Sequence, residues 1–169
     1  LYCSARIFYH LNIFRSPIIK QLGSGFRGLC CSNFKPKKKI LNIMLQENNF
    51  QIEKFDSEVL REYDIRGIVD KNITENTAYT IGRVYGYIVI EKLNSNKVSI
   101  GYDGRLTSPK LFNALSNGLK DAGIDVMNIG ICPTPMLYFA DYHLKTDAGI
   151  MITGSHNPSE YNGFKMVLN

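Results

Sequence analysis

The segment TGSHNP (153–158) places a hydroxyl and an imidazole side by side between two apolar stretches. Three interpretations fit a serine in this setting: the nucleophile of a hydrolase, a residue that carries a phosphoryl group, or part of a tight turn. A nucleophile elbow needs the pattern GxSxG, but Asn157 stands where its second glycine should be. His156 follows Ser155 directly, which we interpret as a poor position for the base of a catalytic triad. The hydrolase is therefore the weakest of the three hypotheses.

A phosphoserine at Ser155 would carry about −1.5 to −2 charges near pH 7 and would need cations and hydrogen-bond donors nearby. The loop and the strand after it offer His156, Asn157 and Lys165, while Arg66 lies in the distant segment REYDIRG (61–67). Four residues of the same loop are also typical turn formers: Asn157, Pro158, Asn162 and Gly163. From spacing alone, the plain turn is the favoured interpretation.

Helices must hold these residues in place. The apolar pattern predicts a helix over 72–93, with Thr74 as its N-cap and Ile81, Tyr85 and Ile88 on its buried face. Ser108 and Pro109 predict the start of a second helix, with the serine as cap. Its buried stripe is expected to be Leu111, Phe112, Leu115, Leu119 and Ala122, ending near Gly123. A third helix is expected from Pro133 or Pro135, carrying Met136, Leu137, Phe139 and Ala140.

Strands are expected over 97–103, 124–130, 148–153 and 164–168. Strands that alternate with helices at this spacing predict a layered α/β domain, a mixed sheet flanked by helices. Ligands of such sheets bind beyond the carboxyl ends of the strands, where the loops 103–108 and 153–163 are expected to meet. We interpret Asp103 and Arg105 as structural members of a polar turn there.

The first 43 residues differ in composition from the rest of the 169-residue chain. They contain eight basic residues and no acidic ones, whereas 44–169 contains all 15 acidic and 12 of the 20 basic residues. We expect 1–43 to be a basic leader that is disordered or not native, and 44–169 to form the folded domain. One interpretation of the leader is an organelle transit peptide. The favoured one is upstream sequence translated in frame, with Met44 as the native start.

Other partners are disfavoured by the same composition. The lysine run 37–39 is too short to indicate nucleic-acid binding, and no apolar run reaches the roughly 18–20 residues that span a bilayer. No CxxC spacing suggests zinc. Cys132 is the single cysteine beyond residue 43, which favours a small buried thiol in a reducing cytoplasm.

Four stretches occur in order along the chain: REYDIRG (61–67), IGYDGRLTSPKL (100–111), TGSHNP (153–158) and YNGFK (161–165). Together they resemble the α-D-phosphohexomutases, most closely the phosphomannomutase/phosphoglucomutase branch. The resemblance covers roughly Phe55 to Asn169 and implies the first domain of a four-domain enzyme. It also implies the reaction: a phosphoserine exchanges its phosphoryl group with a hexose 1- or 6-phosphate through a hexose 1,6-bisphosphate.

By position, the resemblance makes Ser155 the phosphoryl carrier and, through its phosphate, one ligand of Mg²⁺. Arg66 and Lys165 become cations near the transferring group, with Lys165 also a candidate general acid/base. His156 is implied either in proton transfer or, with Asn157, in shaping the loop, and Tyr63 with Arg66 in lining the substrate cleft. The implied catalytic residues are thus Ser155, Lys165, Arg66 and His156. The implied substrate-binding residues are Tyr63, Arg66, Asn157 and Lys165.

Parts of the family pattern do not occur in this sequence. No Asp-Gly-Asp-Gly-Asp-Arg metal loop follows Ser155, and the loop that recognises the sugar and the C-terminal phosphate clamp are also missing. One phosphoserine oxygen cannot hold Mg²⁺ alone. We therefore expect this chain to be inactive by itself and to need the remaining mutase domains. The alternative is a non-catalytic truncated or split-gene module that works with a partner chain.

Overall fold

The computed structural model describes residues 50–53, 56–62 and 64–168. In chain order these form a short 3-10 helix Ser57–Val59, β1 (Ile65–Ile68), α3 (Glu75–Leu93), β2 (Lys97–Tyr102), α4 (Ser108–Asp121), β3 (Asp125–Ile131), α5 (Thr134–Leu144), β4 (Ala148–Ile152) and β5 (Tyr161–Leu168). The basic leader, and with it the expectation about its origin, lies outside the described residues. Among the described helices, none is both long and apolar enough to cross a bilayer.

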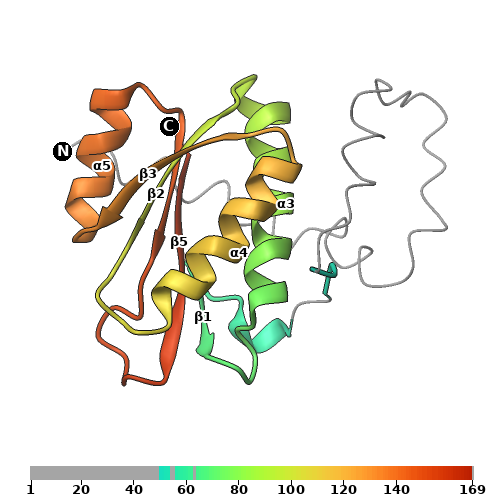
Figure 1. The fold of residues 1–169 in the computed structure, drawn as a ribbon, viewed down its shortest axis with the longest axis vertical. Coiled ribbons are helices and arrows are strands. Elements are labelled where there is room, and N and C mark those ends of the chain that lie inside the picture. Colours follow the sequence, from blue (N-terminus) through green and yellow to red (C-terminus); the bar gives the residue numbers. More distant parts are fainter. Residues whose placement is uncertain (1–49, 54–55, 63, 169) are drawn as a thin grey trace, which may run out of the picture.

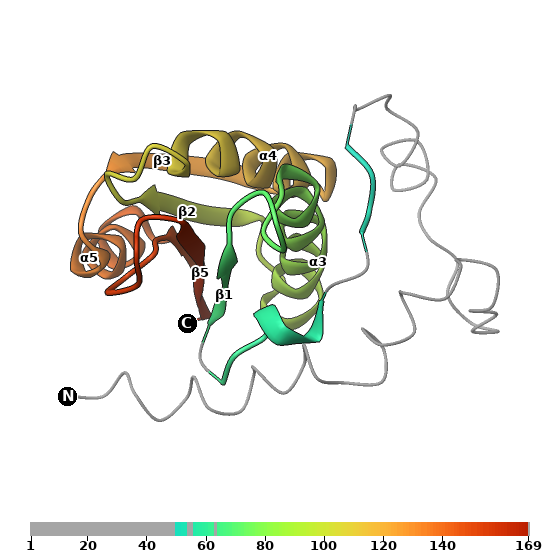
Figure 2. The same ribbon diagram turned by 90° about the horizontal axis from the view of Figure 1, so that it is seen from below.

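The strands form one mixed sheet in the order β1-β5-β4-β2-β3. β2 runs parallel to β3 and β4, whereas β5 is antiparallel to both β4 and β1. α3 and α4 pack together on one face of the sheet and α5 lies on the other (Figures 1 and 2). The predicted layered α/β fold is confirmed.

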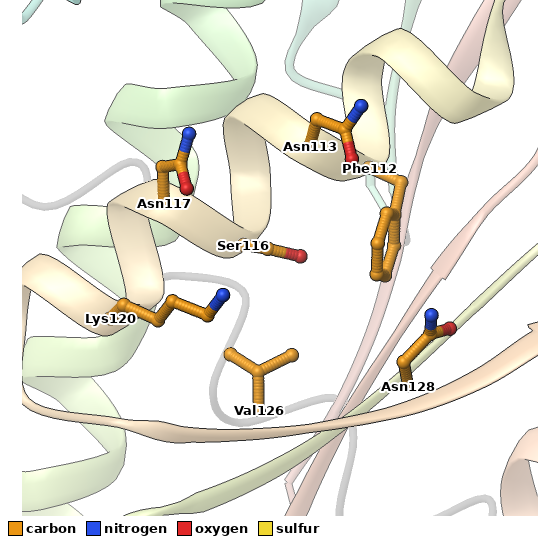
Figure 3. Close-up of a pocket in the computed structure, with 7 residues that line it drawn as sticks. All are labelled: Phe112, Asn113, Ser116, Asn117, Lys120, Val126 and Asn128. Atoms are coloured by element: carbon orange, nitrogen blue, oxygen red, sulfur yellow. The ribbon is translucent and has the colours of Figure 1, made fainter. Parts of the chain in front are cut away.

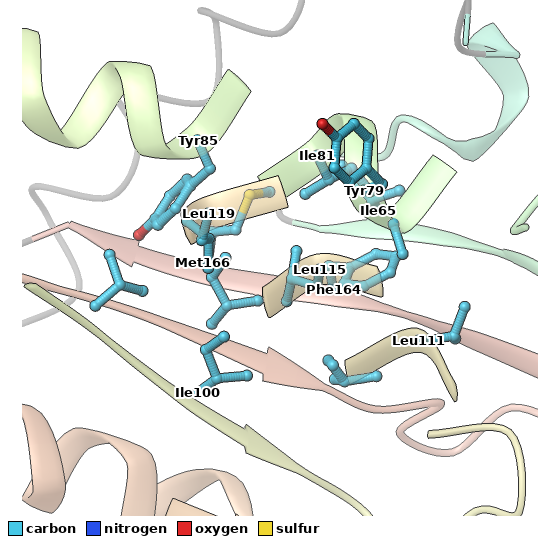
Figure 4. Close-up of a cluster of buried hydrophobic side chains, with 14 of the residues drawn as sticks. Ile65, Tyr79, Ile81, Tyr85, Ile100, Leu111, Leu115, Leu119, Phe164 and Met166 are labelled. Carbon is cyan, nitrogen blue, oxygen red and sulfur yellow. The ribbon is translucent and has the colours of Figure 1, made fainter. Parts of the chain in front are cut away.

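Successive side chains of β4 point to opposite faces of the sheet, so the core has one part on each face. Ile150 and Ile152 belong to the larger cluster under α3 and α4, and Met151 belongs to the smaller cluster under α5. Figure 4 shows the larger cluster, in which Phe164 from β5 lies among side chains of α3, α4 and β1. Phe164 is fully buried.

A short extended segment, Phe50–Glu53, docks against α3. Phe50 stacks on Tyr79 with ring centroids 5.2 Å apart. The Glu53 carboxylate accepts hydrogen bonds from the hydroxyls of Thr74 and Thr77, at 3.0 and 3.1 Å. Thr74 and Thr77 form the capping box that begins α3, which confirms Thr74 as N-cap. The segment thus places a negative charge at the positive end of the helix dipole.

The start of α4 differs from its prediction. Thr107, not Ser108, is the N-cap residue, and its side chain makes no capping hydrogen bond. Ser108 is buried and donates instead to the Asp103 carboxylate, 2.7 Å away. The two strands that flank the site also differ: β1 was not predicted, and β5 begins at Tyr161 rather than residue 164. Both differences arise from one long-range pairing, β1 against the first half of β5.

α5 buries far less apolar surface than its composition predicts. Leu137 is fully buried, but Met136 and Phe139 are 53% and 65% exposed. The buried residues of α5 are Leu137 and, one turn later, Asp141. His143 is exposed and its ring stacks on Phe139, in agreement with an ordinary surface role.

Asp141 is a carboxylate buried between α5 and the sheet. Its Oδ1 accepts from the hydroxyls of Ser99 and Thr146, whereas Oδ2 has no hydrogen-bond partner among the described residues. A Cβ at Gly149 would lie 2.6 Å from that oxygen, so glycine is required beneath it. Burial raises the pKa of Asp141, and the two hydroxyls offset this only in part.

We expect Asp141→Asn to be more stable than the wild type at pH 7, by up to about 1 kcal/mol. Because the pKa of Asp141 is raised in the folded state, protonation stabilises the fold as pH falls through that pKa. The advantage of Asn should therefore shrink as the pH falls through that pKa, because Asp141 itself then becomes neutral. Urea unfolding between pH 4 and 8 measures this, with exposed Asp147→Asn as the control. An advantage independent of pH would contradict the assignment.

Candidate active site at the serine loop

The serine loop, residues 153–160, leaves the sheet at the carboxyl end of β4. β2 lies beside β4 in parallel, with Tyr102 paired to Ile152, so the segment after β2 emerges at the same edge. The Asp103 N–H donates to the Ile152 carbonyl across 2.9 Å. The expected meeting of the two loops is confirmed, and Figure 1 shows them together below the sheet.

Ser155 has a left-handed backbone, with φ of 52°. This conformation costs a non-glycine residue roughly 1–2 kcal/mol, and such strain clusters at functional sites. The side chain is exposed, and its Oγ lies 3.0 Å from His156 Nδ1. His156 Nδ1 thus lies within hydrogen-bond distance of the serine although the two residues are adjacent in the chain. A triad also needs a third group that orients the base, and His156 Nε2 has no hydrogen-bond partner among the described residues.

Arg105 holds the serine loop through several hydrogen bonds of its side chain. Its two terminal nitrogens donate to four main-chain carbonyls. These belong to Ser155 (3.3 Å), Asn157 (2.7 Å), Pro158 (2.6 Å) and Tyr161 (3.0 Å). Its Nε donates to Asp103 Oδ2 across 3.2 Å. These contacts agree with the structural role expected for Arg105.

Asp103 binds Arg105 and also contacts the serine loop and the start of α4. Its carboxylate accepts from the Ser108 hydroxyl and from the N–H groups of Arg105 and Gly154, at 2.7, 3.1 and 2.9 Å. Burial by itself would raise the pKa of Asp103, but these hydrogen bonds outweigh burial and the pKa is lowered. The carboxylate therefore stays ionised at neutral pH, as an anchor for the base of the loop.

Gly154 is required by the approach of Arg105. A Cβ there would lie 2.1 Å from both Cζ and Nε of the guanidinium. We expect Gly154→Ala to displace the arginine and to lower the free energy of unfolding by about 1–3 kcal/mol. Urea unfolding measures the loss. Gly104→Ala is the matched control, because a Cβ at Gly104 meets nothing within 4 Å. Equal stability of the two variants would show that the loop tolerates a displaced Arg105.

Arg66 and Asn157 also contact the loop, but through its main chain. Arg66 is 5% exposed and donates to the Thr153 carbonyl and to Asp64, with which it forms an ion pair. Asn157 donates from both its N–H and its side-chain amide to the Gly154 carbonyl, at 3.1 and 3.0 Å. Asn157 therefore closes the turn that presents Ser155.

Lys165 is half-buried and lies opposite Met151 on the α5 face of the sheet. Its Nζ lies 5.8 Å from the centre of the Tyr138 ring, a cation–π distance. Among the described residues it makes no hydrogen bond or ion pair with the serine loop. Tyr63 lies outside the described residues. Of the site residues predicted from the sequence, the structure thus brings together Ser155, His156, Asn157 and Arg66.

Asn162 is a member of the site that the sequence analysis treated as a turn residue. It is fully buried, and its amide donates to the hydroxyls of Thr107 and Ser108 at 2.9 and 3.0 Å. The start of α4 is thereby joined to the strand after the serine loop. An asparagine in a strand whose other residues are apolar except for Lys165 was the signal that could have indicated this role.

The described residues do not by themselves fit Mg²⁺. No group of three or more His, Cys, Asp or Glu side chains among them could hold a metal ion. Mg²⁺ prefers oxygen ligands in octahedral geometry, and the exposed part of the serine loop offers one carboxylate, that of Glu160, beside the hydroxyls of Ser155 and Ser159.

A pocket of about 310 Å³ lies elsewhere, between α4 and β3 (Figure 3). The pocket is lined by residues of these two elements: Phe112, Asn113, Ser116, Asn117, Lys120, Val126 and Asn128. None of the predicted site residues is among them, so the serine loop and this pocket are separate features.

The fold and the site define an α/β domain that presents one strained serine beyond the carboxyl end of a central strand. The family described as phosphoglucomutase/phosphomannomutase, alpha/beta/alpha domain I, matches residues 57–169. The chain belongs to this family.

Named relatives agree with this assignment. A phosphoglucomutase of Neisseria gonorrhoeae is 49% identical over 111 residues, which cover 66% of this chain and 24% of the relative. A phosphomannomutase/phosphoglucomutase of Pseudomonas putida is 49% identical over 110 residues, with coverages of 65% and 24%. A crystal structure of a family protein from Burkholderia thailandensis has a TM-score of 0.63 at 41% identity, covering 68% of this chain and 26% of that one. The chain thus spans about a quarter of the length of these relatives.

Proposed function

We propose that this chain is the phosphoserine-bearing domain of a hexose-phosphate mutase, with Ser155 as the phosphoryl carrier. The observation that carries the proposal is Ser155 itself: an exposed hydroxyl on a left-handed backbone, presented by a loop whose base is fixed by Arg105 and Asp103. A carrier must accept a phosphoryl group from solution and must not move while it does so. An exposed oxygen on a fixed loop meets both needs.

The imidazole of His156 supports a carrier more than a hydrolase. Ser155 Oγ can pass its proton to His156 Nδ1 across 3.0 Å as it attacks phosphorus, and can recover it when the phosphoryl group leaves. An acyl hydrolase would in addition need a third group that orients the base, and His156 Nε2 has no hydrogen-bond partner among the described residues.

The reaction we propose interconverts hexose 1- and 6-phosphates through a hexose 1,6-bisphosphate, which also serves as activator. Arg66 holds the Thr153 carbonyl and so fixes the entry to the serine loop. Asn157 closes its turn. The role of Lys165 as a cation or general acid/base stays a prediction. The role of Tyr63 as part of the substrate cleft also stays a prediction.

The balance of charge indicates that more of the enzyme is needed for turnover. A phosphoserine brings about −1.5 to −2 charges, but the Arg66 and Arg105 guanidiniums are already engaged with main-chain carbonyls and carboxylates. We propose that Mg²⁺ and the remaining mutase domains supply the missing positive charge and the recognition of the sugar. We further propose a cytoplasmic location, supported by the buried free thiol of Cys132.

The test is to mix the chain with the remaining mutase domains, glucose 1,6-bisphosphate and Mg²⁺, and to measure the intact mass of the chain. We expect an addition of about 80 Da, one phosphoryl group, located on Ser155 by fragmentation. A coupled assay with glucose 1-phosphate, the bisphosphate and Mg²⁺ should show no turnover by this chain alone. Phosphate on another residue would contradict the assignment of the carrier. Substantial turnover would contradict the need for other domains.

A further inference from the structure

Arg105 orders the serine loop in a particular sense. The carbonyls of Ser155 and Pro158 both point toward its guanidinium, at 3.3 and 2.6 Å. The peptide bonds are trans, so the N–H of the next residue points the opposite way from each carbonyl. The N–H groups of His156 and Ser159 therefore point away from Arg105.

These two N–H groups are also unused. Neither donates a hydrogen bond to any described residue, whereas the N–H groups of Gly154 and Asn157 donate to Asp103 and to the Gly154 carbonyl. The His156 N–H belongs to the peptide bond directly after Ser155, and that serine side chain is itself exposed. Each peptide carries a dipole of about 3.5 D, with its positive end at the N–H.

We propose that Arg105 is a positioning residue for phosphoryl transfer. By drawing the carbonyl ends of the loop peptides inward, it turns their N–H ends outward, toward a phosphoryl group on Ser155. The loop then stabilises the negative charge of that group through two oriented main-chain donors. Arg105 acts through the loop and does not touch the substrate. The inference rests on the proposed function, because it assigns a phosphoryl group to Ser155.

Arginine is the side chain that this role requires. A planar guanidinium has five N–H donors in a fixed fork, and here they reach four carbonyls and one carboxylate. A lysine has the same charge, but its three donors radiate from a single nitrogen. Lysine at this position would keep the charge and lose the common orientation of the carbonyls. This difference separates positioning from simple charge.

The test installs phosphoserine at position 155 of the full chain during translation, and follows its ³¹P resonance with pH. We expect its second pKa to lie below the value of about 6 of a free phosphoserine. Arg105→Gln should raise that pKa by about one pH unit, and Arg105→Lys should recover less than half of the shift. Lys110→Gln, which removes a cation paired with Asp70, should have no effect.

Recovery of most of the shift by Arg105→Lys would overturn the proposal in favour of charge alone. An unshifted pKa in the wild type, or no change in Arg105→Gln, would overturn it as well. Because the phosphate is installed without a bisphosphate donor, a failure of Ser155 to accept phosphate in the earlier test would leave this one interpretable.

A second measurement needs no variant and keeps the proposal testable if Arg105→Gln fails to fold. In the phosphorylated wild type, the amide protons of His156 and Ser159 should shift downfield together as the phosphate ionises. The amide protons of Gly154 and Asn157 serve as internal controls and should stay nearly constant, since they already donate within the loop. No shift at His156 and Ser159 would show that these groups do not meet the phosphate.

Discussion

Ser155→Ala should abolish phosphoryl labelling of the chain by glucose 1,6-bisphosphate in the presence of Mg²⁺ and the remaining mutase domains. In a complete enzyme it should lower kcat by roughly 10³-fold or more, because the reaction loses its covalent carrier. The fold should persist, since the side chain is exposed and the loop is fixed by the carbonyl contacts of Arg105. Labelling with radioactive bisphosphate and circular dichroism measure the two effects separately.

Ser155→Gly provides the matched control for this experiment. It removes the same hydroxyl but suits a φ of 52°, so it should be equally inactive and more stable than Ser155→Ala by up to about 1 kcal/mol. Full activity in either variant would show that Ser155 is not the carrier. Labelling of Ser155 by a fluorophosphonate, in place of a transferable phosphoryl group, would instead revive the hydrolase hypothesis.

Phe164→Asp should prevent the domain from folding. Phe164 is fully buried on β5, where it pairs with Ile65 on one side and Ile152 on the other. An aspartate there would bury a charge without a partner and would also leave a cavity, each at a cost of several kcal/mol. The total stability of a domain is only about 5–15 kcal/mol. Thermal unfolding followed by circular dichroism should show no cooperative transition.

Two variants separate burial from the change of residue. Phe139→Asp makes the same substitution at a site that is 65% exposed on α5, and should change the free energy of unfolding little. Phe164→Leu keeps the position apolar and should keep a cooperative transition at lower temperature. A folded Phe164→Asp would mean that Phe164 is not buried in the core beside Ile65 and Ile152.

The sequence predicted the elements whose pattern is local. α3 and α4 have sustained apolar stripes, and parallel strands bring their exits to one edge, so the two loops could be expected to meet. β1 could not be expected, because four residues that include a buried arginine show no strand alternation. The exposed face of α5 was also beyond prediction, since composition does not reveal how much of a helix reaches the sheet.

The sequence predicted which kind of chemistry Ser155 could carry out. It did not predict the backbone conformation of Ser155 or the contacts that hold its loop. Nothing in the local sequence indicates a left-handed serine, because glycine or asparagine is the usual occupant of that conformation. Arg105 was expected in a polar turn, but its carbonyl partners lie 50 to 56 residues further along the chain. Contacts of that range depend on the assembled sheet and leave no periodic signal.

The docked segment Phe50–Glu53 has a practical consequence for any minimal version of this domain. The family match begins at residue 57, but trimming the chain there would remove the carboxylate shared by Thr74 and Thr77 and would uncover the ring of Tyr79. A shortened protein should therefore start upstream of Phe50, or α3 will fray at its N-terminal end.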